Sequence, residues 1–113
     1  MPISNPHVRI VSVDSADGIR LELHGELDRA TALTLALHLL PFERNSAASV
    51  VLDLSDLSFV DVGGLKLFLE TARRVRAAGG QLILANPSSS VRRLLELTAI
   101  DQTADVVDEP VPA

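Results

Sequence analysis

Ser49-Val50-Val51-Leu52-Asp53-Leu54 decides the fold, because it is a short and nearly continuous apolar run near the middle of the chain. Such a run is typical of a central strand that is covered on both faces. Gln81-Leu82-Ile83-Leu84-Ala85 has the same character, and a segment of helical periodicity separates the two runs. Strands joined through a helix favour parallel pairing with a right-handed crossover. The two runs therefore predict parallel strands, with residues 55–60 forming a turn after the first.

Two segments of alternating polarity precede these runs. Val8 to Val13 and Ile19 to Gly25 are separated by the turn-rich stretch Asp14-Ser15-Ala16-Asp17-Gly18, which predicts an antiparallel hairpin. In the second segment apolar residues at positions 19, 21 and 23 alternate with polar ones. One face of this strand is therefore expected to be buried and the other solvated.

Three helices are expected. The first runs from an N-cap at Asp28 to Pro41. The second runs from an N-cap at Asp61 to Gly79-Gly80, and the third starts at Ser88-Ser89-Ser90 with hydroxyl caps. Apolar residues recur at helical spacing in each helix, which predicts the side that faces the sheet. These inner stripes are Ala30, Leu33, Leu37 and Leu40 in the first helix, Leu65, Phe68, Leu69, Ala72 and Val75 in the second, and Val91, Leu94, Leu95 and Thr98 in the third.

The order strand, strand, helix, strand, helix, strand, helix predicts an α/β fold. Its mixed sheet begins with the antiparallel hairpin, continues with parallel strands and is covered by helices. A length of 113 residues, of which 47% are hydrophobic, fits one domain. We expect a single domain over residues 1–113, with a core of about residues 8–107 that ends in one short element at 104–107, and a flexible tail at 108–113.

Composition argues against several classes of protein. The chain has no cysteine, which excludes a disulfide scaffold, a thiol nucleophile and a zinc site built on thiolates. Its formal net charge is −5 and its only aromatic residues are three Phe, which argues against direct binding of nucleic acid. The N-terminus lacks the pattern of a signal peptide, and the longest apolar stretch, Thr31 to Leu40, is too short to span a membrane. We expect a soluble cytoplasmic protein that does not contact a membrane.

No pattern of residues predicts catalysis, a cofactor or a metal. The histidines His7, His24 and His38 have no second ligand at a metal-binding spacing, so surface roles are expected for them. The chain has neither a G-x-S-x-G elbow nor an S-x-x-K pattern. Gly63-Gly64 at the start of the second helix lacks the spacing of a phosphate loop, and Asp61 beside it repels a phosphate. We therefore expect a protein that is not an enzyme, with a nucleotide binder at this helix start as the weakest alternative.

Three stretches together resemble a known family. They are Gly25-Glu26-Leu27-Asp28 after the second strand, the run from Val50 to Asp61 that leads to Gly64-Leu65, and Ala78-Gly79-Gly80-Gln81-Leu82 before the next strand. Over residues 8–107 the chain resembles the STAS domain of bacterial anti-sigma-factor antagonists. The resemblance implies a binding protein without enzymatic activity, which captures an anti-sigma factor of the serine-kinase type and so releases a sigma factor for transcription.

The resemblance also implies where the partner binds. Asp28 matches the Asp of the family's G-E-L-D loop, and Asp61 and Gly64 match the Asp and the Gly of its Asp-Ser-x-Gly motif at a helix start. The Ser of that motif is the phosphate acceptor in members under kinase control, and Val62 occupies its place. Because valine has no hydroxyl group, this position cannot be phosphorylated. The implied surface consists of Asp28, Asp61, Val62, Gly63 and Gly64.

Leucines outside the expected inner stripes support a partner-binding surface. Leu35 and Leu39 lie on the far side of the first helix from its stripe, and Leu67 lies opposite the stripe of the second. Leu67 follows Val62 by about one and a half turns, so it is assigned to the same surface. Exposed leucines are also common on proteins without partners, so both interpretations stay open. A homodimer is also compatible with the sequence.

The same resemblance leaves a second function open. A STAS domain can also be a small accessory subunit of a membrane transporter, docked on a cytoplasmic ATPase of the ABC type. The missing acceptor serine favours this alternative. The two functions differ in the partner that each requires, which is a kinase-like anti-sigma factor in one case and an ATP-binding-cassette subunit in the other.

Overall fold

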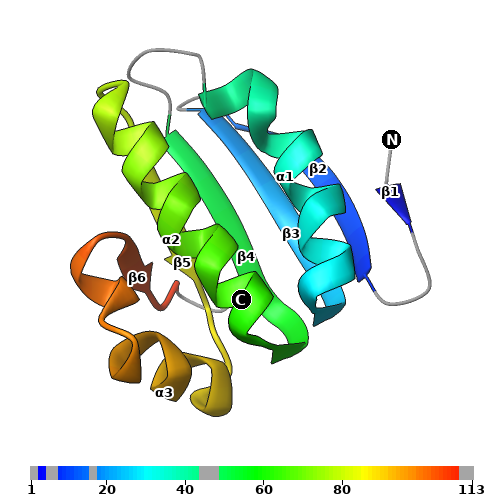
Figure 1. Cartoon of the computed structure of the whole chain (residues 1–113). Helices are drawn as coiled ribbons and strands as arrows, with labels where there is room; N and C mark the ends of the chain where they lie inside the picture. Colours follow the sequence, from blue (N-terminus) through cyan, green and yellow to red (C-terminus); the bar gives the residue numbers. More distant parts are fainter. Residues whose placement is uncertain (1–2, 5–7, 16–17, 44–48, 110–113) are drawn as a thin grey trace.

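The computed structural model describes residues 3–4, 8–15, 18–43 and 49–109. They form one six-stranded sheet whose strands lie in the order in which they occur along the chain, with helices packed on it (Figure 1). The α/β class expected from the sequence is confirmed. The strands are β1 (Ile3–Ser4), β2 (Val8–Ser15), β3 (Gly18–Leu27), β4 (Ser49–Val60), β5 (Gln81–Ala85) and β6 (Asp105–Val107). The helices are α1 (Arg29–Glu43), α2 (Val62–Ala77), α3 (Ser89–Leu97) and the 3₁₀ helix η1 (Ile100–Gln102).

The strands pair as the sequence predicts. β1, β2 and β3 are antiparallel, and β2 and β3 form a hairpin whose last pair is Ser15 with Gly18. From β3 onward all neighbours are parallel, and Leu21, Leu52 and Leu84 lie in register across β3, β4 and β5. The short element expected near the end of the chain is β6, which pairs with β5. β1 was not expected, because two residues are too few to show an alternation.

α1 and α2 lie side by side across one face of the sheet, and the core lies between them and the strands (Figure 1). Leu23 of β3, Leu52 of β4 and Leu84 of β5 belong to this core and have no exposed surface. Val51 and Ile83 point to the other face and remain partly exposed. The expectation that β4 is covered on both faces was therefore wrong, because α1 and α2 cover only one of them.

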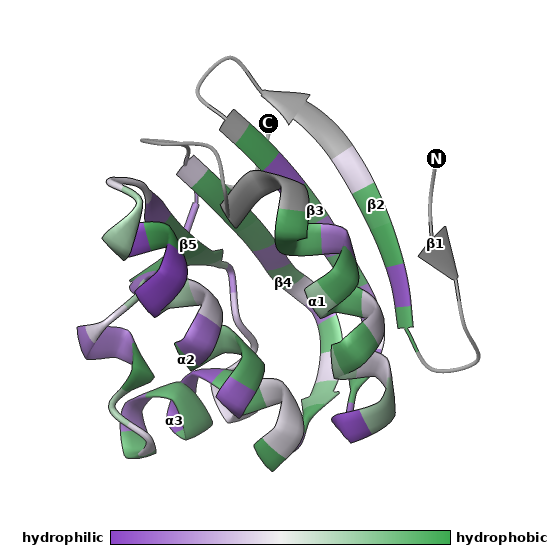
Figure 2. Ribbon diagram, turned by 45° about the horizontal axis from the view of Figure 1, so that its top comes forward, coloured by the Kyte–Doolittle hydropathy of each residue, from purple (hydrophilic) through white to green (hydrophobic). Residues whose placement is uncertain are grey.

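The buried side of α1 is the opposite of the one expected. Leu35 and Leu39 are fully buried, whereas Leu33 and Leu37 are 69% and 70% exposed. The prediction was wrong because apolar residues surround the helix axis between Ala30 and Leu40, so that their spacing fits either side. Figure 2 shows the same feature, since α1 is coloured as hydrophobic over most of its described length.

Two elements extend further along the chain than expected. α1 passes Pro41 and ends at Glu43. β4 continues through residues 55–60, where a turn was expected, and ends at Val60. The extension occurs because β3 itself runs on to Leu27 and offers an edge for pairing, so that Leu27 pairs with Val60.

The ends of α2 and the start of α3 carry the expected capping residues. Gly79 follows α2 with a φ of 88°, a left-handed conformation that favours glycine. Gly80 donates its backbone N–H to the carbonyl of Val75 at 2.8 Å, which is the long bond of a Schellman motif. Ser88 is the N-cap of α3, and its Oγ accepts the backbone N–H of Val91 at 3.3 Å. These predicted helix boundaries are confirmed.

The residues after β6 turn back toward the middle of the sheet. The guanidinium of Arg20 in β3 donates to both carboxylate oxygens of Glu109, at 2.8 and 2.5 Å, and to Asp53 of β4 at 2.8 Å. The side-chain amide of Asn86 donates to the Glu109 carboxylate and accepts its backbone N–H. The sequence favours a flexible tail from residue 108, but these contacts tie Glu109 to the sheet, and residues 110–113 lie outside the described part of the chain.

Candidate partner-binding site

Asp61 joins the starts of the two long helices. It is the N-cap of α2, because its Oδ1 accepts the backbone N–H of Gly64 at 3.1 Å. Its Oδ2 accepts the backbone N–H of Arg29, the first residue of α1, at 3.2 Å. The backbone N–H of Asp61 donates to the carbonyl of Leu27 at 3.1 Å. The predicted N-cap is confirmed, and the same carboxylate also fixes the start of α1 against the start of α2.

Asp28 caps α1 in a reciprocal arrangement with Thr31. The backbone N–H of Thr31 donates to Oδ1 of Asp28 at 2.8 Å, and the backbone N–H of Asp28 donates to Oγ1 of Thr31 at 2.8 Å. The predicted N-cap at Asp28 is confirmed. Thr31, which is only 2% exposed, escaped the sequence patterns above. The sequence pattern that could have predicted its role is a polar residue three positions after the N-cap, as in a capping box.

Gly63 and Gly64 allow the start of α2 to approach β3 and α1 closely. A Cβ atom on Gly63 would lie 2.8 Å from the Cα of Arg29. A Cβ atom on Gly64 would lie 2.5 Å from a methyl group of Val60 and 2.9 Å from the carbonyl oxygen of Leu27. Gly64 is buried, so it positions the site and is not part of its exposed surface.

Val62 is the most exposed of the predicted site residues. It is the first residue of α2 and is 79% exposed. It lines a groove of about 550 Å³ between α1 and α2. The structure therefore brings Asp61, Val62 and Gly63 together at the mouth of one groove, close to the capped start of α1. Residues that line this groove include Ala32, Leu33 and Ala36 from α1 and Val62, Gly63 and Lys66 from α2.

Leu67 does not lie on the exposed surface to which the sequence assigned it. It is only 6% exposed and belongs to the core, where it also forms part of the groove floor. Leu35 and Leu39, the other leucines assigned to a partner surface, are fully buried. For α1, the buried and the exposed sides were predicted the wrong way round. For α2, the buried side is wider than predicted, because this helix packs against both the sheet and α1. The leucines available to a partner on α1 are instead Leu33 and Leu37.

Charged groups surround the apolar part of the groove. Arg29, Lys66, Asp61 and Glu70 all line it, so both signs are present. Lys66 is 74% exposed at its side chain and lies 3.9 Å from Glu70, which also pairs with Arg74 at 3.4 Å. An apolar centre with a charged margin is typical of a protein-binding surface.

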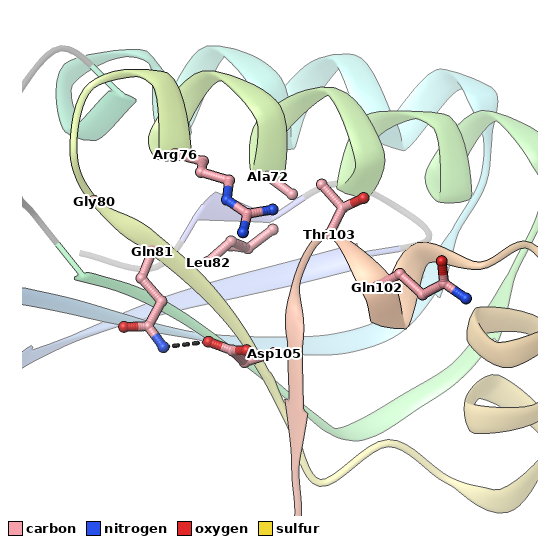
Figure 3. Close-up of a pocket in the computed structure, with 8 residues that line it drawn as sticks. All are labelled: Ala72, Arg76, Gly80, Gln81, Leu82, Gln102, Thr103 and Asp105. Carbon is pink, nitrogen blue, oxygen red and sulfur yellow. Dashed lines mark hydrogen bonds between the residues drawn. The ribbon is translucent and has the colours of Figure 1, made fainter.

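A second hollow lies at the other end of α2. It has a volume of about 260 Å³, and its lining includes Arg76, Gln81, Thr103 and Asp105 (Figure 3). Gln81 donates a hydrogen bond to Asp105, so these two polar groups already satisfy each other. The hollow is small and polar, and it contains none of the residues predicted for the site.

The two histidines that the structure describes make contacts outside the groove. His24 lies on the open face of the sheet, where its Nδ1 is 3.0 Å from Asp56. His38 is within 3.2 Å of the Ser12 hydroxyl, and partial burial lowers its pKa. His7 lies outside the described residues. Within the part of the chain that the structure describes, no three His, Asp or Glu side chains gather as a metal site, and no helix is long and apolar enough to cross a membrane.

Comparison with known proteins identifies the family. The model of the STAS domain matches residues 9–109. The anti-sigma-B factor antagonist of Bacillus subtilis is 32% identical over 88 residues, which cover 78% of this chain and 80% of that protein. The unphosphorylated form of the anti-sigma factor antagonist SpoIIAA has the same fold, with a TM-score of 0.76 at 23% identity over 89% of this chain and 88% of that one.

A membrane protein also contains this fold. The murine anion transporter Slc26a9 matches 87% of this chain with 17% of its own, at a TM-score of 0.72 and 18% identity. The fold by itself is therefore shared by proteins of different function. The match of the family model over residues 9–109, together with the 32% identity to the Bacillus subtilis protein, shows that this chain belongs to the STAS domain family.

Proposed function

We propose that this chain is an anti-sigma factor antagonist. It binds an anti-sigma factor of the serine-kinase type in the cytoplasm and so frees a sigma factor for transcription. The surface is the groove at Asp61, Val62 and Gly63 together with Asp28, which caps the neighbouring start of α1, and Gly64 holds this surface in shape. The names of the relatives support the partner class, since proteins from Bacillus subtilis and Paenibacillus polymyxa that match about four fifths of this chain are both anti-sigma factor antagonists.

One observation carries the proposal, which is the exposure of Val62. The resemblance gives this position to the serine that the partner phosphorylates, and a phosphate acceptor must be reachable by the partner. Val62 meets this requirement at 79% exposure. It stands beside Asp61, which the hydrogen bonds to Gly64 and Arg29 hold in place. Val62 lines the same groove as Ala32, Leu33 and Ala36 of α1, so it belongs to an apolar surface and not to a single exposed site, which favours contact with a partner.

Without a hydroxyl group the interaction has no covalent off switch at this position. A phosphate would add a charge of about −1.5 to −2 next to Asp61 and oppose a partner that fits the uncharged surface. Val62 removes that possibility and adds apolar contact area. Phosphorylation at this position therefore cannot release the anti-sigma factor from the chain.

The test is a titration of the full chain with the purified anti-sigma factors of the same cell, one at a time, in a calorimeter. One of them is expected to bind. Val62→Asp should then weaken binding by about a hundredfold or more, because burying an unpaired charge costs several kcal/mol and each 1.4 kcal/mol is about tenfold. The variant should stay folded, since a carboxylate at a helix N-terminus is favoured by about 0.3–1 kcal/mol.

The control is Val62→Ser, which should retain binding and become phosphorylated by the partner in the presence of ATP. The proposal is wrong if none of the anti-sigma factors binds the wild-type chain. It is also wrong if Val62→Asp binds as tightly as the wild type while circular dichroism shows both to be folded.

A transporter subunit that docks on an ATPase remains the second candidate. The observation in its favour is the shared fold with part of Slc26a9, but that likeness extends to 18% identity only. The two candidates differ in a direct measurement. Binding to a purified ATP-binding-cassette subunit, combined with no binding to any anti-sigma factor, would favour the transporter.

A further inference from the structure

One side of α1 is apolar, and none of the residues that the structure describes covers it. Leu33, Leu37 and Leu40 follow each other at intervals of four and three residues, so they form one stripe along the helix, called the leucine stripe below. Their exposed fractions are 69%, 70% and 39%. The opposite side of α1 is already buried in the core. A helix that is apolar all round is typical of a helix covered on both sides, which indicates that another molecule packs on the stripe.

The composition of α1 sets it apart from its neighbour. Between Ala30 and Leu40 it contains no Asp, Glu, Lys or Arg. The exposed side of α2 carries Lys66, Arg73 and Arg76, as expected for a helix whose outer side faces water. The two helices lie side by side on the same sheet (Figure 2). Their similar position in the fold therefore does not explain why only α1 lacks charged residues on its outer side.

The leucine stripe begins inside the candidate groove. Leu33 lines the groove together with Val62, and Leu37 follows Leu33 by about one helical turn. Val62, Leu33 and Leu37 therefore form one continuous apolar surface. It starts at the position that the proposed function assigns to the partner and runs along α1 away from it.

The charged side chains that line the groove indicate the charge of the partner residues that contact them. Arg29 is exposed and makes no ion pair among the described residues. Lys66 is 74% exposed and has only a long contact of 3.9 Å to Glu70. Both are basic and both line the groove beside Leu33. Asp61 and Glu70 line the groove as well, but the Asp61 carboxylate accepts the backbone N–H groups of Gly64 and Arg29, and Glu70 pairs with Arg74 at 3.4 Å. The side-chain charges of Arg29 and Lys66 are therefore the ones available to an acidic side chain of the partner.

A second copy of the chain is a poorer occupant. A stable interface between two proteins buries about 800 Å² on each partner. Three leucines on one side of one helix supply less than this by themselves. The leucine stripe and the groove around Val62 together form a larger surface. A partner that binds Val62 can therefore cover both.

We infer that the leucine stripe is the second part of the partner interface. An apolar segment of the anti-sigma factor lies along α1, with its apolar side chains on Leu33, Leu37 and Leu40 and an acidic residue near Arg29 and Lys66. The inference rests on the proposed function, because it concerns the same partner.

The test uses the anti-sigma factor that binds the wild-type chain, titrated with full-length variants. Leu37→Gln removes apolar surface outside the groove without adding charge, and Gln has about the helix propensity of Leu. Leu97→Gln is the matched control, because Leu97 is 71% exposed and lies in α3. We expect Leu37→Gln to weaken binding about tenfold and Leu97→Gln to change it by less than about twofold. Arg29→Gln should weaken binding at low salt and lose this effect at high salt.

The outcomes separate the two ideas. If Val62→Asp abolishes binding and Leu37→Gln binds as tightly as the wild type, the leucine stripe is not part of the interface and the proposed function stands. If no anti-sigma factor binds the wild-type chain, both are wrong. If the wild-type chain sediments as a dimer and Leu37→Gln as a monomer, the occupant is a second copy, which overturns the inference. An unchanged affinity of Arg29→Gln at low salt overturns the acidic contact.

Discussion

Arg20 and Glu109 form a bidentate ion pair across the sheet, although 89 residues separate them in the chain. The guanidinium of Arg20 also holds Asp53, so one cation serves two carboxylates from different parts of the chain. The side chain of Arg20 is 24% exposed and that of Glu109 is 37% exposed. Water therefore weakens the pair, and its loss should cost on the order of 1 kcal/mol or less.

We predict that this cluster makes the protein sensitive to acid. Hydrogen bonds from Arg20 and Asn86 hold the pKa of Glu109 below its usual range. Burial raises the pKa of Asp53, but hydrogen bonds from Ser55, Arg20 and Asn86 outweigh it, so that this pKa is lowered as well. Carboxyl groups with lowered pKa values stabilise the folded state above their unfolded pKa, and this stabilisation disappears as the pH falls through the folded pKa.

Urea unfolding between pH 7 and pH 3 checks the prediction. The free energy of unfolding should be flat above about pH 5 and should fall below about pH 4. In Arg20→Gln the fall should be smaller, because both carboxyl pKa values return toward normal. Arg93→Gln is the control, since Arg93 is exposed and makes no ion pair among the described residues. An equal acid dependence in Arg20→Gln and wild type would contradict the assignment.

Gly64→Ala should destabilise the fold. The added methyl group would lie 2.9 Å from the carbonyl oxygen of Leu27. Because this oxygen belongs to the backbone, relieving the clash requires a shift of β3 or α2. Overpacking of this kind costs about 1–3 kcal/mol. Gly80→Ala is the matched control, because Gly80 does not have a positive φ. Thermal unfolding measures both variants, and equal melting temperatures would show that the start of α2 adjusts freely.

Asp61 should be more important for stability than an ordinary N-cap. Asp61→Ala removes the acceptor for Gly64 in α2 and for Arg29 in α1, so a loss of about 2 kcal/mol is expected, the upper end for a cap. Asp61→Asn keeps one carbonyl oxygen and should lose less. Chemical denaturation ranks the variants, and a loss in Asp61→Ala below about 0.5 kcal/mol would mean that the bridge between the helices adds nothing.

Asp28 has a structural role that can be separated from a role in binding. Asp28→Asn keeps the oxygen that accepts the backbone N–H of Thr31, so the melting temperature should stay close to that of the wild type. It alters a carboxylate that is assigned to the partner surface, so the affinity for the anti-sigma factor should fall. Calorimetry and thermal unfolding of the same sample decide, and an unchanged affinity would leave Asp28 with the capping role alone.

The sequence predicts those parts of the fold that local chemistry determines. Asp28 and Asp61 are caps because their carboxylates satisfy helix N–H groups, and Gly79 ends α2 because a positive φ favours glycine. The buried side of α1 was predicted wrongly, since its leucines occur on every side and only the sheet selects Leu35 and Leu39. The extension of β4 to Val60 depends on β3 as its partner, and no pattern within residues 55–60 shows it.

The candidate site follows the same division. Asp61, Val62 and Gly63 were assigned to the site from the resemblance to the family, and the structure brings them to one groove. Leu33 was missed because it was assigned to the core, although it faces Val62's groove. Leu67 was assigned to the surface and is buried, because α2 contacts α1 as well as the sheet. In α2 the apolar positions that contact α1 could not be told apart, from the sequence alone, from positions that face solvent.

The order of the strands has a consequence for synthesis on the ribosome. In the part of the chain that the structure describes, the spatial order from β1 to β6 repeats the order of emergence. Each new strand can therefore join the free edge of the sheet that precedes it, and none has to be inserted between two strands that are already paired. The growing chain can fold as it lengthens, and β6 and the ion pair between Arg20 and Glu109 form last.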